Sequence, residues 1–335
     1  MSETTQEKQE ELEYVNEISN LKLSSRFSNG FKLLFFPKSR LEHFYSRDVE
    51  NLPRKKSSKI RRMLKSSFTF TGVIIIFLII SLAIFGPWIA PYSYQAASSR
   101  YVLGRWAPPS PEHLLGTGYA GRDVLSRIIY GTSTSLTIAL LAVSISVFFG
   151  IMLGLVAGYF GKWFDSIIMR ILDIILAFPG IVFALAFLAI IGSTIEHIVA
   201  ILGVIGIPFY ARLTRSSVLK VKELDYIAAA KVSGAKTWRI MVRHILPNSI
   251  QPIIISMTFD IGRLIISVAT LAFLGFADNR YITWGSDLFL ARAYIYEAPW
   301  AMFWPSVMIS ISVIGFMIIG DGLRDILDPK DQVLT

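Results

Sequence analysis

The residues best suited to chemistry are two charges inside a long apolar stretch. Asp260 and Arg263 stand three residues apart, which places them on one face of a helix. Ionisable side chains within an apolar span mark transport pathways, proton relays or structural ion pairs. We expect the two to pair and to face a helix bundle or a pathway, with the functional and the purely structural interpretations equally open. Arg170 and Asp173 repeat the spacing, and there a structural pair is favoured.

Other reaction chemistry finds no support in the sequence. The chain has no cysteine, which excludes disulfides, thiolate metal sites and a cysteine nucleophile. Its four histidines are scattered, and no His/Asp/Glu group has metal-ligand spacing. Gly161 and Lys162 form the one plausible phosphate-binding pair, but Trp163 follows and Val156 replaces the first glycine of a P-loop. We expect neither an enzyme nor a bound cofactor or metal in this chain.

Apolar runs that would position these charges fill a large part of the chain, which has 335 residues. The chain is 53% hydrophobic and only 17% charged, whereas a soluble domain is about 25% charged. Residues 68–90 carry no charge, and about 20 apolar residues cross a hydrocarbon core of about 30 Å. Five more runs follow, at 134–158, 166–191, 195–214, 249–275 and 300–322. We predict an all-α polytopic membrane protein with six transmembrane helices, not a soluble helical core.

Positive charge is concentrated at the N-terminus. Residues 1–67 hold 14 of the 33 lysines and arginines. Because basic residues stay on the cytoplasmic side, this tail is expected in the cytoplasm, and six crossings return residues 327–335 there. Residues 91–133 become an external loop, and residues 134–326 form the core, with a cytoplasmic loop at 215–248. The net charge of +9 thus indicates multi-pass topology in a cell membrane, not nucleic-acid binding.

The cytoplasmic loop contains a compact helical segment, LDYIAAAKVSGAKTWRIMVRHILPN, from Leu224 to Asn248. Asp225 is a suitable N-cap, and Gly234 suits the left-handed position that ends a helix. Thr237 is expected to cap a second short helix, and Pro247 to break the chain before the fifth span.

Small residues recur in two places. Ala228, Ala229 and Ala230 leave room for another protein to approach the loop helix closely, although an ordinary helical loop is the alternative. Gly150, Gly154 and Gly158 repeat every four residues in the second span. Such a face favours close helix packing, within this chain or against a partner.

Taken together, these motifs resemble a known family. The loop is similar to the EAA motif of permease subunits of ATP-binding-cassette (ABC) importers, with Gly234 and the Leu246–Pro247 pair in the matching places. The external segment HLLGTGYAGRDVLSRIIYGTSTSL resembles the GTDxxGRDxxSRxxxG signature of the C-type subunit of oligopeptide/dipeptide permeases. GDGLRDILDP, from Gly320 to Pro329, resembles that subunit's ending. The resemblance covers roughly residues 68–330. The external signature residues are Gly116, Thr117, Gly121, Arg122 and Asp123.

The resemblance implies a type I ABC importer permease fold and alternating access. ATP and Mg²⁺ would be bound by partner subunits and none by this chain. The implied partners are a second homologous permease, two ATPase subunits, an extracellular or periplasmic solute-binding protein and the lipid bilayer. The residues expected to couple to the ATPase are Asp225, Tyr226, Ala228, Ala229, Ala230, Gly234, His244 and Pro247.

The chain departs from the family pattern at two positions. Ala228 stands where the family usually has Glu, and Gly118 stands in place of the Asp of GTD. The family most often imports di- and oligopeptides, while related systems carry oligosaccharides or nickel chelates. A secondary transporter is the alternative class, but it would leave the alanine-rich loop unexplained.

Overall fold

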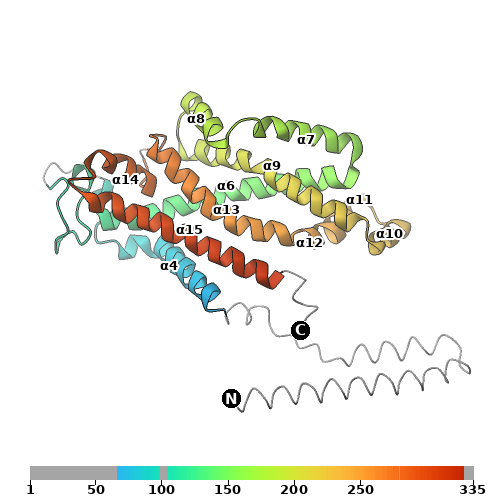
Figure 1. Ribbon diagram of the computed structural model, residues 1–335, viewed down its shortest axis with the longest axis horizontal. Helices are drawn as coiled ribbons and strands as arrows, with labels where there is room; N and C mark the ends of the chain where they lie inside the picture. The colour runs from blue at the N-terminus through green and yellow to red at the C-terminus, as the bar shows by residue number, and fades with distance from the viewer. Residues whose placement is uncertain (1–65, 99–103, 279, 328–335) are drawn as a thin grey trace, which may run out of the picture. The chain divides into compact units, whose positions relative to one another are not determined.

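The computed structural model describes residues 66–98, 104–278 and 280–327. The predicted tail at 1–67 lies outside these ranges except for its last two residues, and the segment 327–335 except for Leu327. Within the described ranges, five helices are long and apolar enough to cross a membrane. They are α4 (Ser67–Ile89), α6 (Val124–Phe160), α9 (Ile195–Lys222), α13 (Gln251–Phe273) and α15 (Pro299–Leu327) (Figure 1).

The predicted third span is not one continuous helix. Instead of one helix over 166–191, the structure has α7 (Lys162–Leu176) and α8 (Gly180–Ile191), bent by 79°. Pro179 causes the break, because a proline disfavours helical backbone in the residue before it. If the bent pair counts as one span, the described part of the chain has up to six, so the expected continuous helix is wrong.

The helices alternate in direction between two ends. The short helix α14 (Trp284–Ala291) marks one end and α10 (Asp225–Val232) the other (Figure 1). Helices α4, α7–α8 and α13 run toward the α14 end, and α6, α9 and α15 run back (Figure 1). We call the end marked by α14 the outer end and the end marked by α10 the inner end.

Glycines bring α6 and α9 into close contact. A Cβ atom added at Gly150 would lie 2.3 Å from the Cβ of Tyr210, and one at Gly154 would lie 2.4 Å from the carbonyl oxygen of Ala211. At Gly158 the nearest atom would be a Val218 methyl at 2.8 Å. The repeated glycines therefore serve packing within this chain, one of the two expected uses.

Several helices are longer than the apolar runs that predicted them. Helix α6 begins at Val124, so residues 124–133, which were predicted as part of a loop, are helical and continuous with the second span. Asp123 starts it, because its carboxylate accepts a hydrogen bond from the Ser126 backbone N–H at 2.8 Å. Helix α9 runs past the predicted end at residue 214 to Lys222, because its last turns pack against other helices and not lipid.

The inner segment differs in detail from the prediction. Leu224, not Asp225, occupies the N-cap of α10, and Lys236, not Thr237, precedes α11 (Thr237–Ile240). A π-helical turn (Met241–Ile245) and α12 (Leu246–Ser249) follow. Pro247 therefore does not break the chain, because it lies in the first turn of α12, where its missing N–H is not needed. Gly234 has φ +74°, as predicted for the left-handed end of α10.

The remaining short elements lie at the outer end. They are α5 (Tyr94–Ser98) and two 3₁₀ turns, η2 (Tyr119–Gly121) and η4 (Arg292–Tyr294). The apolar core between the two ends is built mainly from α6, α9 and α13.

Candidate functional sites

Helix α10 is held at the inner end by one buried side chain. Ile227 is fully buried and packs in a cluster with residues of α6, α9, α11 and the π-turn. The other members include Leu155, Val218, Val221, Ile240, Met241 and Ile245. The sequence reasoning missed Ile227, although an isoleucine among alanines in a short polar helix is a signal of an anchor.

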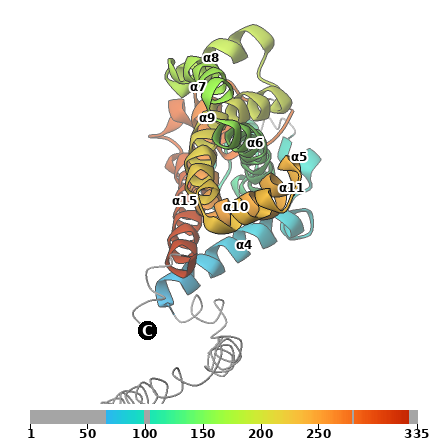
Figure 2. The same ribbon diagram turned by 90° about the vertical axis from the view of Figure 1, so that its right-hand side faces the viewer.

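The opposite face of α10 is open. Asp225, Tyr226, Ala228 and Ala229 are exposed, and Ala230 is half-buried against the cluster. Val232, near the end of α10, is 89% exposed and adds an apolar side chain to this open face. Figure 2 shows α10 and α11 at the end of the bundle that faces the viewer.

The predicted coupling residues do not form one cluster. Those from Asp225 to Gly234 lie on α10 or at its end, whereas His244 and Pro247 lie on the π-turn and α12. The carbonyl of His244 accepts a hydrogen bond from the Asn248 side-chain amide at 2.6 Å. His244 and Pro247 therefore belong to the connection between α10 and α13.

Lysines connect this region to α6. The Lys222 ammonium donates to the Tyr159 carbonyl at 2.7 Å, and Lys231 stands 5.9 Å above the Tyr159 ring. Helix α10 is therefore attached to the ends of α6 and α9 together.

At the outer end, Asp123 organises the predicted signature. It is 4% exposed and accepts hydrogen bonds from the backbone N–H and the hydroxyl of Ser126, the latter at 2.7 Å. His113 Nδ1 lies 2.9 Å from its other oxygen. Thr117 forms a short antiparallel bridge with Asp123. The signature residues therefore fold a tight turn and start α6.

The glycines of this turn meet geometric demands. Gly116 has φ +77°, and a Cβ there would lie 2.6 Å from the indole nitrogen of Trp300. That indole donates to the Thr117 carbonyl at 3.1 Å. Gly121 has φ +72° and is buried. Only glycine meets both demands at Gly116 without strain.

A buried ion pair crosses the outer end. Arg127 of α6 donates through Nε to Asp287 of α14 at 2.6 Å and through Nη1 to the Ala97 carbonyl at 2.9 Å. The side chains are only 7% and 12% exposed. Beside them, the Trp284 indole donates to the Ile128 carbonyl at 3.1 Å. Arg127 lies in the external segment that resembles the C-type signature, but its pairing with Asp287 could not be predicted from the sequence.

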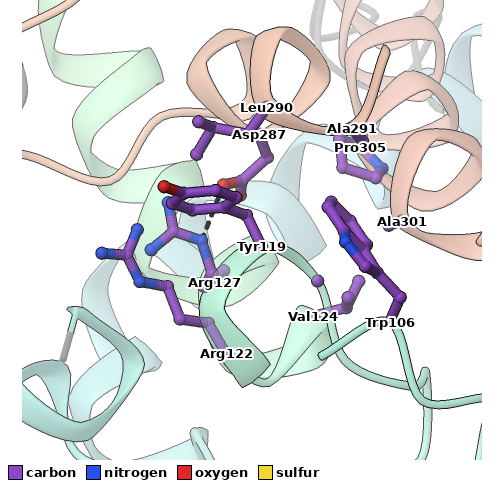
Figure 3. Close-up of a pocket in the computed structure, with 11 residues that line it drawn as sticks. Trp106, Tyr119, Arg122, Val124, Arg127, Asp287, Leu290, Ala291, Ala301 and Pro305 are labelled. Atoms are coloured by element: carbon purple, nitrogen blue, oxygen red, sulfur yellow. Dashed lines mark hydrogen bonds and ion pairs between the residues drawn. The ribbon is translucent and has the colours of Figure 1, made fainter. Parts of the chain in front are cut away.

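A small cavity adjoins this pair. Its volume is ≈ 20 Å³, and its lining includes Trp106, Tyr119 and Arg122. Figure 3 shows the Arg127–Asp287 pair beside Tyr119, with Trp106 facing them. The cavity is about large enough for one water molecule, so it is not a substrate site in this conformation.

The intramembrane charges pair as expected in one place and differently in another. Asp260 Oδ1 accepts from Nε and Nη2 of Arg263, at 2.7 and 2.6 Å. Asp173 pairs with Arg212 of α9, so the expected Arg170–Asp173 pair is wrong. The reason is that α7 turns its charged side toward α9, where Asp165 also pairs with Arg215.

A second ion pair closes the outer end. Arg280 contacts Asp278 at 2.6 Å, and Asp278 also accepts from the Ile195 backbone N–H at 3.2 Å. The hydrogen bonds from Arg280 hold the pKa of Asp278 below its usual range. This contact ties the loop after α13 to the start of α9.

The described ranges contain no cluster of metal-binding side chains. Within them, no three His, Asp or Glu side chains gather in a way that could hold a metal ion.

The fold defines an all-helical, multi-pass membrane protein with a short exposed helix at one end. Residues 150–331 match the family model for the binding-protein-dependent transport system inner membrane component. Residues 59–109 match the N-terminal transmembrane domain of oligopeptide transport permease C. The chain belongs to this family of binding-protein-dependent transport permeases and is of the oligopeptide permease C type.

Individual relatives agree. The dipeptide transport system permease protein DppC of Alkalihalophilus pseudofirmus is 42% identical over 271 residues, covering 81% of this chain and 88% of that protein. The glutathione transport system permease protein GsiD of Pectobacterium atrosepticum is 40% identical over 271 residues, covering 81% and 89%. Among solved structures, a chain of the inward-facing MetNI methionine ABC transporter is 19% identical with a TM-score of 0.49, covering 60% of this chain and 96% of that one.

Family membership establishes the general role. The chain is a non-catalytic permease subunit of an ABC importer in the inner or plasma membrane. The complex binds ATP through a separate ATPase subunit and receives solute from a binding protein.

Proposed function

We propose that this chain forms half of the translocation pathway of a peptide importer and that α10 couples it to an ATPase. The observation that carries the coupling role is the form of α10: an exposed small-residue face on a helix held by buried Ile227. Exposed alanines permit a groove of another protein to close around the helix, and the buried anchor transmits its movement.

The connections of α10 explain how movement would spread. Helix α9 ends at Lys222, three residues before α10 begins, and α11, the π-turn and α12 lead from α10 into α13. A displacement of α10 would therefore be transmitted to two spans as a rigid-body shift. Such a shift between two packings is the physical basis of alternating access.

The assembly requires a second, homologous permease and two ATPases. One chain provides five or six spans and one exposed helix of this kind in the described ranges, so two permeases would present two coupling helices to an ATPase pair. The inner end and both termini would face the cytoplasm, as the basic residues indicate. The outer end, with its glycine-containing turn, would receive the solute-binding protein.

Peptides are the substrate class that the relatives favour. The names of the relatives specify dipeptide, D,D-dipeptide and glutathione transport. Each of these compounds is short, contains peptide bonds and carries carboxylates.

The coupling role is tested by filling the small face of α10. Ala229→Trp should reduce ATP-driven peptide uptake at least about ten-fold in proteoliposomes that hold the whole complex, because the bulky ring prevents close docking. The matched control is Ala186→Trp, an exposed alanine on α8 that lies outside both proposed docking surfaces. Co-purification of the ATPase and the number of ATP molecules hydrolysed per peptide are measured together. Unchanged uptake and stoichiometry in Ala229→Trp would refute the coupling role.

The substrate class is tested separately on the binding protein of the system. Calorimetric titration with dipeptides, oligopeptides, oligosaccharides and a nickel chelate should show binding of peptides alone. Tight binding of a sugar or of the chelate would replace the peptide assignment and leave the coupling role intact.

A further inference from the structure

One face of α13 carries a row of polar residues through the membrane span. Their spacing alternates between four and three residues, which keeps them on one side of a helix. The members of this polar stripe are Ser256, Asp260, Arg263, Ser267 and Thr270. The neighbouring face of α13 packs in the core through apolar side chains such as Ile261, Leu264, Ile265 and Val268.

The centre of the stripe is an asymmetric ion pair. Asp260 is 6% exposed and fully engaged: Oδ1 accepts from Arg263, and Oδ2 accepts from the Tyr210 hydroxyl of α9 at 3.1 Å. The Arg263 side chain is 63% exposed. A guanidinium has five N–H donors, and those not directed at Asp260 are available on the open side.

The hydroxyls of the stripe support a polar environment there. Ser267 donates to the Arg263 carbonyl at 3.1 Å, Thr270 donates to the Ile266 carbonyl at 2.8 Å, and both residues are half-buried. Their oxygens remain able to accept hydrogen bonds. Because a charged side chain is costly against lipid, this face must meet water or polar groups in the assembled complex.

We propose that the polar stripe of α13 lines the translocation pathway and that Arg263 there attracts the carboxylate of a peptide substrate. This inference rests on the peptide function proposed above. Asp260 positions the guanidinium and offsets most of its charge, which keeps the attraction weak. Weak attraction suits a pathway, because a substrate held tightly midway would not leave.

Two other occupants fit an exposed guanidinium: an acidic side chain of the second permease and a lipid phosphate. The carboxylate would exclude water from the stripe, whereas the hydrated phosphate would cancel the positive charge of Arg263. Measurement of water access together with charge preference therefore distinguishes them from a pathway.

The absence of native cysteine in this chain permits a direct measurement. Ser267→Cys, one turn from Arg263, serves as the reporter in membrane vesicles that contain the whole complex. Two thiol reagents of similar size are compared, the anionic sulfonatoethyl and the cationic trimethylammonium-ethyl methanethiosulfonates. Phe77→Cys on α4, which replaces a side chain 67% exposed on an apolar surface, is the lipid-facing control.

We expect both reagents to label the reporter and neither to label the control. Relative to their rates with a free thiol, the anionic reagent should react about five-fold faster at the reporter. Absence of labelling, or labelling without this preference, would overturn the proposal.

Charge variants added to the reporter assign the preference to Arg263. Arg263→Gln should abolish it, Arg263→Lys should retain it, and Asp260→Asn should increase it because the positive charge is no longer offset. Co-purification with the ATPase shows that each variant assembles. A preference that persists in Arg263→Gln would contradict the role of Arg263.

A peptide arm separates this inference from the proposed function. A dipeptide with a free carboxylate should slow labelling of the reporter during transport at least about three-fold more than its C-terminal amide. Equal protection by the two peptides would overturn carboxylate recognition. If the native complex imports no peptide while labelling still depends on Arg263, the peptide function fails and the charged pathway stands. If peptide import occurs without Arg263-dependent labelling, the inference alone fails.

Discussion

The two ends of the helix bundle are built in opposite ways. At the outer end, buried polar contacts join segments far apart in sequence, such as Arg127 with Asp287 and Trp300 with Thr117. At the inner end, α10 has one buried residue, Ile227, and no side-chain cap. Large apolar side chains there, Val232 and Trp238, are 89% and 71% exposed.

This difference indicates which end is fixed by its own contacts. Buried hydrogen bonds and ion pairs specify one geometry, because each unsatisfied group is costly. The outer end therefore holds its shape by its own contacts. The inner end leaves apolar and small residues open, the surface on which the proposed coupling role places an ATPase subunit.

The largest expected effect comes from breaking the buried pair of the outer end. Arg127→Ala leaves Asp287 charged and without its arginine, which should lower the free energy of unfolding by about 3–5 kcal/mol. Thermal unfolding of the purified chain in detergent measures this change. Arg292→Ala is the control at the same end, since this exposed arginine stacks on Phe289 at 4.1 Å. The control should cost about 1 kcal/mol or less. Equal losses of stability in the two variants would show that the buried ion pair stabilises the outer end no more than an exposed arginine does.

At the inner end, the buried anchor Ile227 should stabilise α10, whereas the exposed face of α10 should not contribute to its stability. Ile227→Ala removes a fully buried side chain and should cost about 2–5 kcal/mol of local stability. Limited proteolysis should then cleave between residues 224 and 236 faster than in the native chain. Val232→Ala, on the same helix, should leave the cleavage rate unchanged. Protection of Ile227→Ala equal to that of the native chain would show that α10 is held by other contacts.

Periodic and local features were predictable from the sequence. Apolar length predicted most of the spans, and glycine spacing predicted close packing of α6 but not that α9 is its partner. Gly234 predicted the end of α10 because only local backbone geometry is involved. The Asp260–Arg263 pair follows from i,i+3 spacing on one helix in the same way.

Features that depend on distant residues were not predictable. Arg212 competes with Arg170 for Asp173, and nothing local indicates which arginine wins. The partner of Arg127 lies 160 residues away. The bend at Pro179 was missed because hydropathy reports composition and not backbone direction. Pro247 was misjudged because a proline ends one helix or begins another, depending on the turn before it.

The smallest expected effect concerns Asp278 at the outer end, whose ionised carboxylate should stabilise the folded protein. Because the pKa of Asp278 is lowered in the folded protein, its ionised form contributes stability above the usual aspartate pKa of about 3.9, and this contribution is lost as pH falls through the lowered value. At pH 7, the free energy of unfolding of Asp278→Asn should be about 1 kcal/mol lower than that of the native chain. The difference between the two proteins should shrink below pH 4 and vanish in stronger acid. Unfolding midpoints in detergent from pH 7 to pH 3 measure it, and a difference that stays constant across that range would mean that Asp278 stabilises the outer end by packing and not by its charge.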